Sequence, residues 1–189
     1  MIQDAELPDV VRAAGRGEHW ALAALFRAYQ PGLLRYLRAQ EAGAADDLAS
    51  EVWIGVARGL REFTGDEAAF RAWLYTIARR RLIEHRRRAA RRRTEVVAAD
   101  RFEHVVDPAS GDDPARTVLD QLGAQRAIDR LTAELTPEQC EAVLLRVVAG
   151  LTVAEVARIM RRPPGTVRVL CHRALRRLAA RLGGEVRSR

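Results

Sequence analysis

At 189 residues and 21.1 kDa, the chain has room for one ordinary domain or two small ones. Its net charge of +7 favours an anionic partner, and because all 32 basic residues are arginines, only their clustering is informative. With only two cysteines, the chain has no disulfide framework. Its N-terminus lacks the apolar run of a signal peptide, and no stretch reaches the roughly 20 consecutive apolar residues that a membrane span needs. We therefore expect a soluble cytoplasmic protein without membrane insertion, and neither a metal nor a cofactor.

The first part of the chain shows helical periodicity and almost no strand pattern, which predicts an all-α fold. We expect one amphipathic helix over residues 20–29, a break at Pro31-Gly32 and a second helix over residues 33–40. A long helix over about residues 44–60 follows.

The helix predicted over residues 44–60 has an apolar stripe at every fourth position and acids in its first two turns. The stripe comprises Leu48, Val52, Val56 and Leu60, and the acids are Asp46, Asp47 and Glu51. Acids commonly stabilise a helix N-terminus through the macrodipole, so their position alone identifies no site.

Another long helix is predicted over about residues 67–88, after a turn at Thr64-Gly65-Asp66. Core spacing is kept by Phe70, Trp73, Leu74, Ile77 and Ala78, whereas Arg71, Tyr75, Arg79 and Arg86 lie on roughly the opposite face. Nine arginines against one glutamate follow between residues 79 and 93. A solvated basic face is the alternative, but we favour phosphate binding because so many like charges repel one another unless they are neutralised.

Residues 94–120 form a different kind of segment, with seven acids against two arginines and with proline and glycine interrupting any helix. We interpret this segment as a flexible acidic linker. It divides the chain into two small helical domains, over residues 1–93 and 121–189.

The second domain contains two capping boxes, Thr136 with Gln139 and Thr152 with Glu155, each at the start of a helix. A turn at residues 163–165 precedes a third helix with buried positions at Val167, Cys171, Ala174 and Leu178. A short helix, a tight turn and a longer helix are typical of a DNA-binding helix-turn-helix.

The charge of this motif supports DNA binding, since residues 152–181 contain eight arginines and one glutamate. Three helices packed for their own sake would explain the periodicity but not this one-sided charge. Recognition helices read base edges with their N-terminal residues, so Arg168 and Arg173 could donate to guanine or phosphate and Val169 could contact a thymine methyl group. Arg176 and Arg177 are more suited to the DNA backbone.

Residues 151–157, 163–168 and 172–174 resemble region 4 of bacterial sigma factors. Residues 45–53 resemble region 2.2, and residues 70–79 resemble region 2.3 running into region 2.4. The layout, with only a linker between these regions, is similar to the extracytoplasmic-function (ECF) group of the sigma-70 family. The resemblance implies a non-catalytic initiation factor that binds core RNA polymerase, recognises the −10 and −35 promoter elements and helps to melt DNA.

The resemblance also implies roles for individual residues. Contacts to core RNA polymerase, mainly at its β′ clamp and also at its β flap, would involve Asp46, Asp47, Leu48, Glu51, Val52 and Trp53. The −10 element would be bound by Arg71, Trp73, Tyr75, Arg79, Arg80 and Arg86, although the spacing of Trp73 also fits a core residue. The −35 element would be bound by Pro164, Thr166, Arg168, Val169, His172, Arg173, Arg176 and Arg177. An anti-sigma factor is a further partner expected of the group.

One departure from the family pattern concerns specificity, because Val169-Leu170-Cys171 stands where many members carry Ser-Arg-Leu. Two alternative functions remain at this point. A conventional helix-turn-helix regulator would bind promoters without polymerase. An enzyme acting on nucleic acid would need more than the acids Asp46, Asp47 and Glu51, which have neither a histidine nor a glycine-rich phosphate loop beside them.

Overall fold

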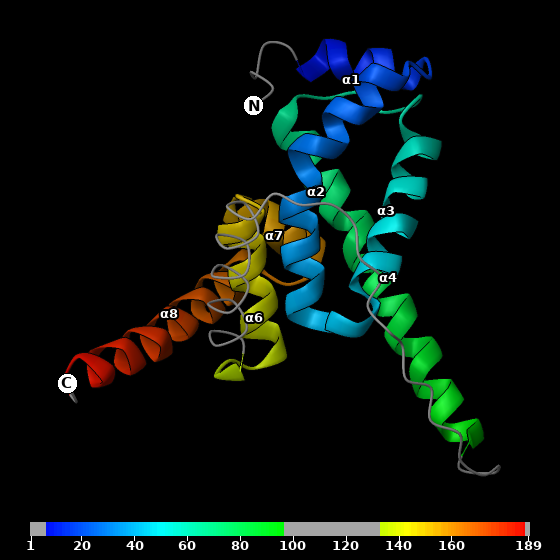
Figure 1. Ribbon diagram of the computed structural model, residues 1–189. Coiled ribbons are helices and arrows are strands. Elements are labelled where there is room, and N and C mark those ends of the chain that lie inside the picture. Colours follow the sequence, from blue (N-terminus) through cyan, green and yellow to red (C-terminus); the bar gives the residue numbers. More distant parts are fainter. Residues whose placement is uncertain (1–6, 97–132, 188–189) are drawn as a thin grey trace.

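The computed structural model describes residues 7–96 and 133–187, and these residues form helices and connecting turns without strands (Figure 1). The first domain comprises α1 (Leu7–Gly15), α2 (His19–Glu41), the short 3-10 helix η1 (Ala42–Ala44), α3 (Ala45–Gly59) and α4 (Glu67–Val96). The second domain comprises α6 (Pro137–Val143), the π-helix η2 (Leu144–Val148), α7 (Val153–Met160) and α8 (Pro164–Arg187). The all-α prediction with two helical domains is confirmed. Beyond residue 96, the predicted linker lies outside the described residues.

The predicted break at Pro31-Gly32 is wrong, because α2 continues through Pro31 as a single helix. Proline in a helix interior removes one backbone hydrogen bond and usually kinks or ends the helix. Here the residues on either side of the proline share one buried face, comprising Ala21, Leu25, Leu33, Tyr36 and Leu37. Burial of this continuous stripe outweighs the local preference.

Two other boundaries differ from the sequence prediction. Helix α4 runs to Val96, eight residues beyond the expected end at residue 88. Helix α8 begins at Pro164, so that only Arg161, Arg162 and Pro163 form the turn before it, with Arg161 in the left-handed region at φ 54°. Proline suits the first turn of a helix because its missing N–H would have had no helical partner there.

Helix α1 was not expected from the sequence. It packs across α2, and its buried side chains are Val10, Val11, Ala13 and Ala14. None of the described helices is long and apolar enough to cross a bilayer.

Aromatic rings join the helices of the first domain into one core. The ring of Phe70 on α4 lies 5.1 Å from that of Tyr29 on α2 and 5.7 Å from that of Phe63, measured between centroids. Tyr36 meets Tyr75 edge-on at 5.3 Å. The tilted and edge-on arrangements are those that aromatic pairs prefer.

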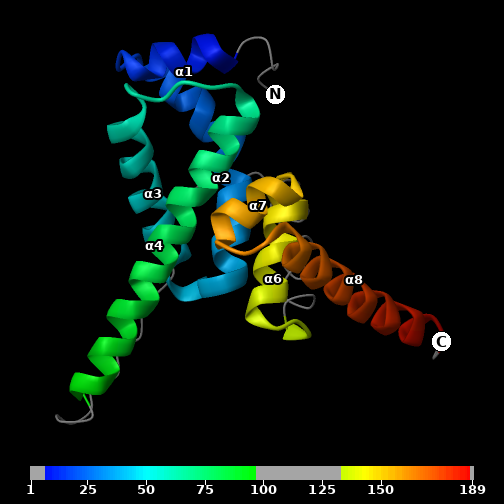
Figure 2. The same cartoon turned by 180° about the vertical axis from the view of Figure 1, so that it is seen from behind.

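The two domains pack against each other. Helix α7 lies along α4 and η2 lies along α2, and both views of the ribbon show α6 and α7 against the first domain while α8 projects away from it (Figure 2). The buried apolar side chains of both domains form one continuous cluster. The sequence, which suggested two tethered domains, gave no sign of this contact.

We expect the protein to lose stability above about pH 10, because burial raises the pKa of all three tyrosines, Tyr29, Tyr36 and Tyr75, above 10.0. Below that pH the tyrosines are protonated in both the folded and the unfolded chain. Above it, only the unfolded chain releases their protons, so the free energy of unfolding falls as the pH rises. Arginine stays charged and lysine is absent, and burial also raises the pKa of the Cys140 and Cys171 thiols, so the cysteines lower the stability at alkaline pH in the same direction.

The measurement is an alkaline titration that follows tyrosinate absorbance and helical circular dichroism together. Both signals should change in the same pH range. Full ionisation of the tyrosines with the helical signal intact would contradict the prediction.

Candidate nucleic-acid and polymerase interfaces

The helix-turn-helix is defined by local hydrogen bonds at the starts of α6 and α7. The Thr136 side chain accepts from the Gln139 backbone N–H at 3.3 Å, and the Gln139 side chain accepts from the Thr136 N–H at 3.2 Å. Thr152 and Glu155 make the same reciprocal pair at 3.3 and 2.6 Å. Both predicted capping boxes are confirmed. They fix where each helix begins independently of the rest of the fold.

Helix α8 presents a cationic face to solvent. Its buried positions are Val167, Ala174 and Leu178, and Cys171 is half-buried. All the side chains predicted to bind the −35 element are exposed, namely Pro164, Thr166, Arg168, Val169, His172, Arg173, Arg176 and Arg177. Val169 is 47% exposed, whereas Leu170 is half-buried against the core. Of the three residues that depart from the family pattern, therefore, only Val169 is exposed on the outward face, because Leu170 and Cys171 are half-buried.

The face of α4 that should bind the −10 element is mostly covered, contrary to the expectation that it lies opposite the core. Tyr75 is 2% exposed and packs against Tyr36. Arg71 pairs with Glu67 of its own helix. The Arg79 Nε donates to Glu141 of α6 at 2.7 Å, and both side chains are mostly buried. Helix α2 and the second domain together cover this face.

Further along α4, most of the basic run is neutralised within the first domain. Several guanidinium groups lie within 4.0 Å of a carboxylate. Glu84 pairs with Arg80 and Arg81, Glu51 pairs with Arg81 and Arg88, and Glu41 pairs with Arg86. Arg80 keeps 70% of its side chain exposed and Arg86 keeps 44%. Beyond them Arg87, Arg91 and Arg92 are also exposed, although they are not among the residues that the sequence predicts to bind the −10 element. The exposed cations of α4 are therefore Arg80 and the arginines from Arg86 to Arg92.

Trp73 behaves as a packed aromatic residue. Its ring stacks on Phe63 with 5.0 Å between centroids and lies over Gly59, where an added Cβ would come within 2.8 Å of the indole. A larger residue at position 59 would displace the tryptophan. The core interpretation of Trp73 accordingly fits the structure better than direct DNA contact.

The buried apolar residues and the acidic residues of α3 lie on different faces of the helix. Leu48 and Val52 are 2% and 0% exposed, so they hold the helix in the core and cannot contact polymerase as expected. Asp47 is exposed, and Asp46 accepts from Arg38 at 3.2 Å.

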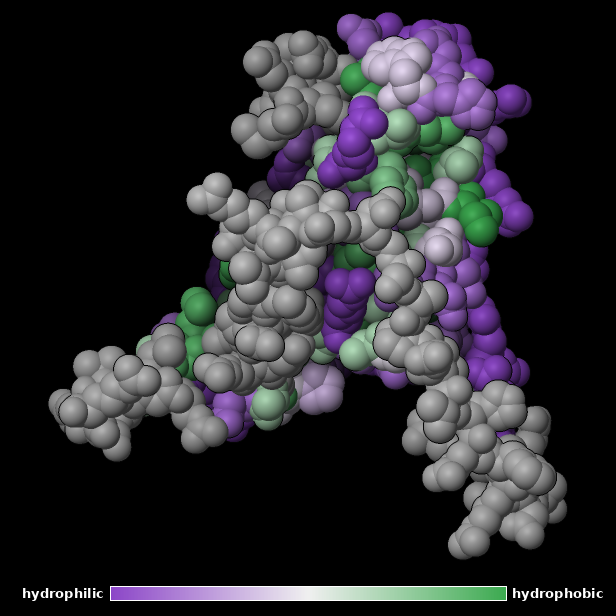
Figure 3. Space-filling model, in the orientation of Figure 1, coloured by the Kyte–Doolittle hydropathy of each residue, from purple (hydrophilic) through white to green (hydrophobic). Residues whose placement is uncertain are grey.

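Beside the acids of α3 lies an apolar surface. The Trp53 indole N–H donates to Gln30 at 2.7 Å and its ring lies 5.2 Å from that of Phe26. Phe26 is 44% exposed and Ile54 is 50% exposed. Figure 3 shows this edge of the molecule as mostly hydrophilic with a hydrophobic patch on α3. A mixed acidic and apolar surface of this kind is suited to a protein partner.

Two family models match the chain in the order that the motifs predict: Sigma-70 region 2 over residues 25–92, and Sigma-70, region 4, over residues 125–178. The chain belongs to the sigma-70 family. The first domain therefore corresponds to region 2 and the second domain to region 4.

Curated relatives place the chain within the ECF group. The ECF RNA polymerase sigma factor BldN of Streptomyces coelicolor is 34% identical over 185 residues, which cover 97% of this chain and 68% of that relative. The ECF RNA polymerase sigma factor SigC of Mycobacterium tuberculosis is 32% identical over 163 residues, covering 86% of this chain and 83% of the relative.

Solved structures agree on the fold. CnrH, solved in complex with the cytosolic domain of CnrY, is 17% identical with a TM-score of 0.61, and the match covers 96% of this chain and 99% of CnrH. The sigma factor RpoE from Bartonella quintana, solved with the anti-sigma factor NepR, is 21% identical with a TM-score of 0.62, over 85% and 96% of the two chains.

The function expected from the resemblance is thus confirmed. The protein is a sigma factor that binds core RNA polymerase and directs promoter-specific initiation. The alternative of a conventional helix-turn-helix regulator is not favoured, because both sigma regions are present in order.

Replacing Thr152 with alanine should destabilise the second domain by about 1 kcal/mol, since it removes the acceptor that caps α7. Thr76→Ala is the matched control, because its hydroxyl bonds only to the Ala72 carbonyl four residues back within α4. Urea unfolding should show a lower midpoint for Thr152→Ala than for Thr76→Ala. Equal midpoints would show that the capping box contributes nothing measurable.

Proposed function

We propose that α8 reads the −35 element in the major groove while the basic half of α4 holds the −10 region. The observation that carries this proposal is the exposed N-terminal face of α8, which follows a capped helix and a tight turn. Arg168, Val169 and Arg173 would face base edges, and Arg176 and Arg177 would contact phosphates. Because Val169 offers only an apolar contact, the −35 sequence preference should differ from that of members with a polar residue there.

For the −10 region, we propose a groove formed by Arg80 and Arg86 together with Arg87, Arg91 and Arg92. These side chains are exposed and cationic, as capture of a single strand requires. Arg71 and Arg79 would join this groove only after the second domain has moved away, whereas Tyr75 stays packed against Tyr36 of the first domain. Trp73 would act by positioning the turn at residues 64–66 rather than by touching DNA.

The polymerase contact proposed for the first domain is the outer face of α3. Asp47 and Glu51 would supply charge to the β′ clamp, and Phe26, Trp53 and Ile54 would supply apolar area. Asp46 is partly engaged by Arg38, and the buried Leu48 and Val52 only support the helix.

A second polymerase contact is proposed for the second domain. Between η2 and α8 lies an apolar groove of about 350 Å³, whose lining includes Val143, Val147 and Leu175. Val147 is 69% exposed and Leu175 is 55% exposed. An apolar helix of the β flap would cover these side chains.

The remaining assignments follow from the family. We propose that the chain carries out no catalysis itself, that RNA synthesis belongs to the polymerase, and that the protein works in the cytoplasm at the nucleoid. An anti-sigma factor is the proposed regulatory partner, in keeping with the complexes in which the two related folds were solved.

Run-off transcription with purified core RNA polymerase on genomic DNA tests the proposed function. Adding the protein should produce new start sites, and Arg168→Ala should weaken initiation at those sites without reducing binding to core polymerase. No new start sites, combined with tight binding of the free protein to duplex DNA, would contradict the proposal.

Asp47→Arg tests the polymerase contact. Asp47 is exposed at the start of α3, whereas Glu51 lies 3.8 Å from both Arg81 and Arg88, so reversing Glu51 would also disturb the fold. We expect Asp47→Arg to weaken core binding by about tenfold or more, with circular dichroism unchanged. Glu62→Arg, equally exposed and outside α3, is the charge-matched control. Equal core affinities for the two variants would argue against this surface.

A further inference from the structure

The contact between the two domains is specific rather than incidental. The Arg79–Glu141 pair joins α4 to α6 at 2.7 Å, with side-chain exposures of 20% and 13%. Glu141 is also close enough to the buried Tyr36 of α2 to help raise the pKa of its phenol, although burial is the larger cause. One carboxylate of the second domain is therefore inserted between two helices of the first.

The backbones of the two domains also approach closely near this pair. A Cβ added at Gly150, which has a φ of +64°, would lie 3.4 Å from the Arg71 Nη1. A Cβ added at Gly32 would lie 3.9 Å from the Val148 carbonyl oxygen and 3.0 Å from the Tyr75 hydroxyl. The second domain thus meets α4 at Arg71, beside Gly150, and at Arg79, which pairs with Glu141, while Gly32 and Tyr36 of α2 lie against Tyr75.

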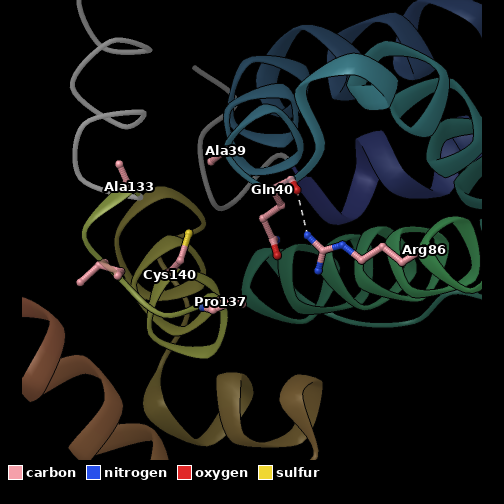
Figure 4. A pocket seen from close by; sticks show the side chains of 7 residues that line it. Ala39, Gln40, Arg86, Ala133, Pro137 and Cys140 are labelled. Carbon is pink, nitrogen blue, oxygen red and sulfur yellow. Dashed lines mark hydrogen bonds between the residues drawn. The ribbon is translucent and has the colours of Figure 1, made fainter. Parts of the chain in front are cut away.

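The interface is incompletely packed. A cavity of about 310 Å³ lies between the domains, lined by Ala39, Gln40 and Arg86 from one side and by Ala133, Leu135, Pro137 and Cys140 from the other. Figure 4 shows Arg86 donating to the Gln40 carbonyl across from Pro137 and Cys140. A second hollow of about 420 Å³ separates the start of α4 from α7. Both hollows are open to solvent, so the side chains that line them have no packing partner across the interface, and separation of the domains costs less than it would for a fully packed core.

We propose that the second domain acts as a built-in cover, which holds the free protein in a closed form and excludes single-stranded DNA from the covered face of α4. The inhibitory part of this inference rests on the proposed function of α4. In the closed form the Glu141 carboxylate occupies the position beside Arg79 that a DNA phosphate would take. Phosphate and carboxylate compete for one guanidinium group, so closure and strand binding exclude each other.

Cys140 reports directly on this closure. Its thiol is 6% exposed and lines the cavity between the domains, and burial raises its pKa to about 11. A thiol reagent therefore reacts with it slowly until the domains separate. Cys171, half-buried within the second domain, provides an internal reference for unfolding of that domain.

The experiment compares Glu141→Arg with Glu138→Arg in the full chain. Both changes reverse one charge on α6, but Glu138 pairs with Arg162 of its own domain and is 53% exposed. We expect Glu141→Arg to label at Cys140 about tenfold faster than the wild type, because it sets two arginines against each other in a mostly buried site. Labelling of Cys171, followed by mass spectrometry, should stay unchanged. Glu141→Arg should also bind a mixed-sequence single-stranded oligonucleotide more tightly than Glu138→Arg.

The charge-swapped double variant Arg79→Glu/Glu141→Arg restores an ion pair and should restore protection of Cys140, which separates opening of the domains from a general folding defect. Equal Cys140 labelling in Glu141→Arg and Glu138→Arg would overturn the closed form. If Glu141→Arg labels faster at Cys140 than Glu138→Arg but binds the oligonucleotide with the same affinity, the proposed exclusion of single-stranded DNA is wrong. The labelling experiment uses neither DNA nor polymerase. Its outcome therefore tests the closed form even if run-off transcription contradicts the proposed function.

Discussion

Helix α4 must belong to the apolar core and carry a dense row of guanidinium groups at the same time, and the arrangement of the other helices follows from this constraint. Phe70, Leu74, Ala78 and Leu82 bury one side of it completely or nearly so. The cations on its other sides would repel one another unless carboxylates approached them. Helices α2, α3 and α6 each supply one, as Glu41, Glu51 and Glu141. Charge neutralisation therefore accompanies the packing of these three helices on α4 as far as about Arg88.

The parts of the fold that the sequence predicted correctly are those decided by neighbouring residues. The capping boxes at Thr136 and Thr152 depend on contacts three residues apart, and the family motifs are equally local. The helix break predicted at Pro31 is wrong because the burial of both halves of α2 outweighs the usual tendency of proline to end or kink a helix. The Arg79–Glu141 pair, 62 residues apart, leaves no local signal, and neither does the burial of Tyr75 against Tyr36 of α2.

Sharing DNA recognition between two domains makes the spacing between them part of the specificity. Under the proposed function, each domain alone would offer one helix with a few base or phosphate contacts, and such contacts give weak binding. When a polymerase holds both domains at a fixed distance, the two weak contacts act together through their effective concentration. The free chain instead places α7 against α4, where this cooperation cannot occur. Promoter affinity is therefore a property of the complex more than of either helix.

The absence of lysine, so that arginine supplies every permanent positive charge of α4 and α8, has a consequence for control by modification. Acetylation acts on amines, and no side chain here provides one, so metabolic acyl donors cannot lower the charge of either helix. Guanidinium groups also stay protonated at any pH a cell reaches. The guanidinium charge of both helices is thus independent of pH and of acetylation, and the approach of a carboxylate, as at Arg79 and Glu141, is one way to neutralise it.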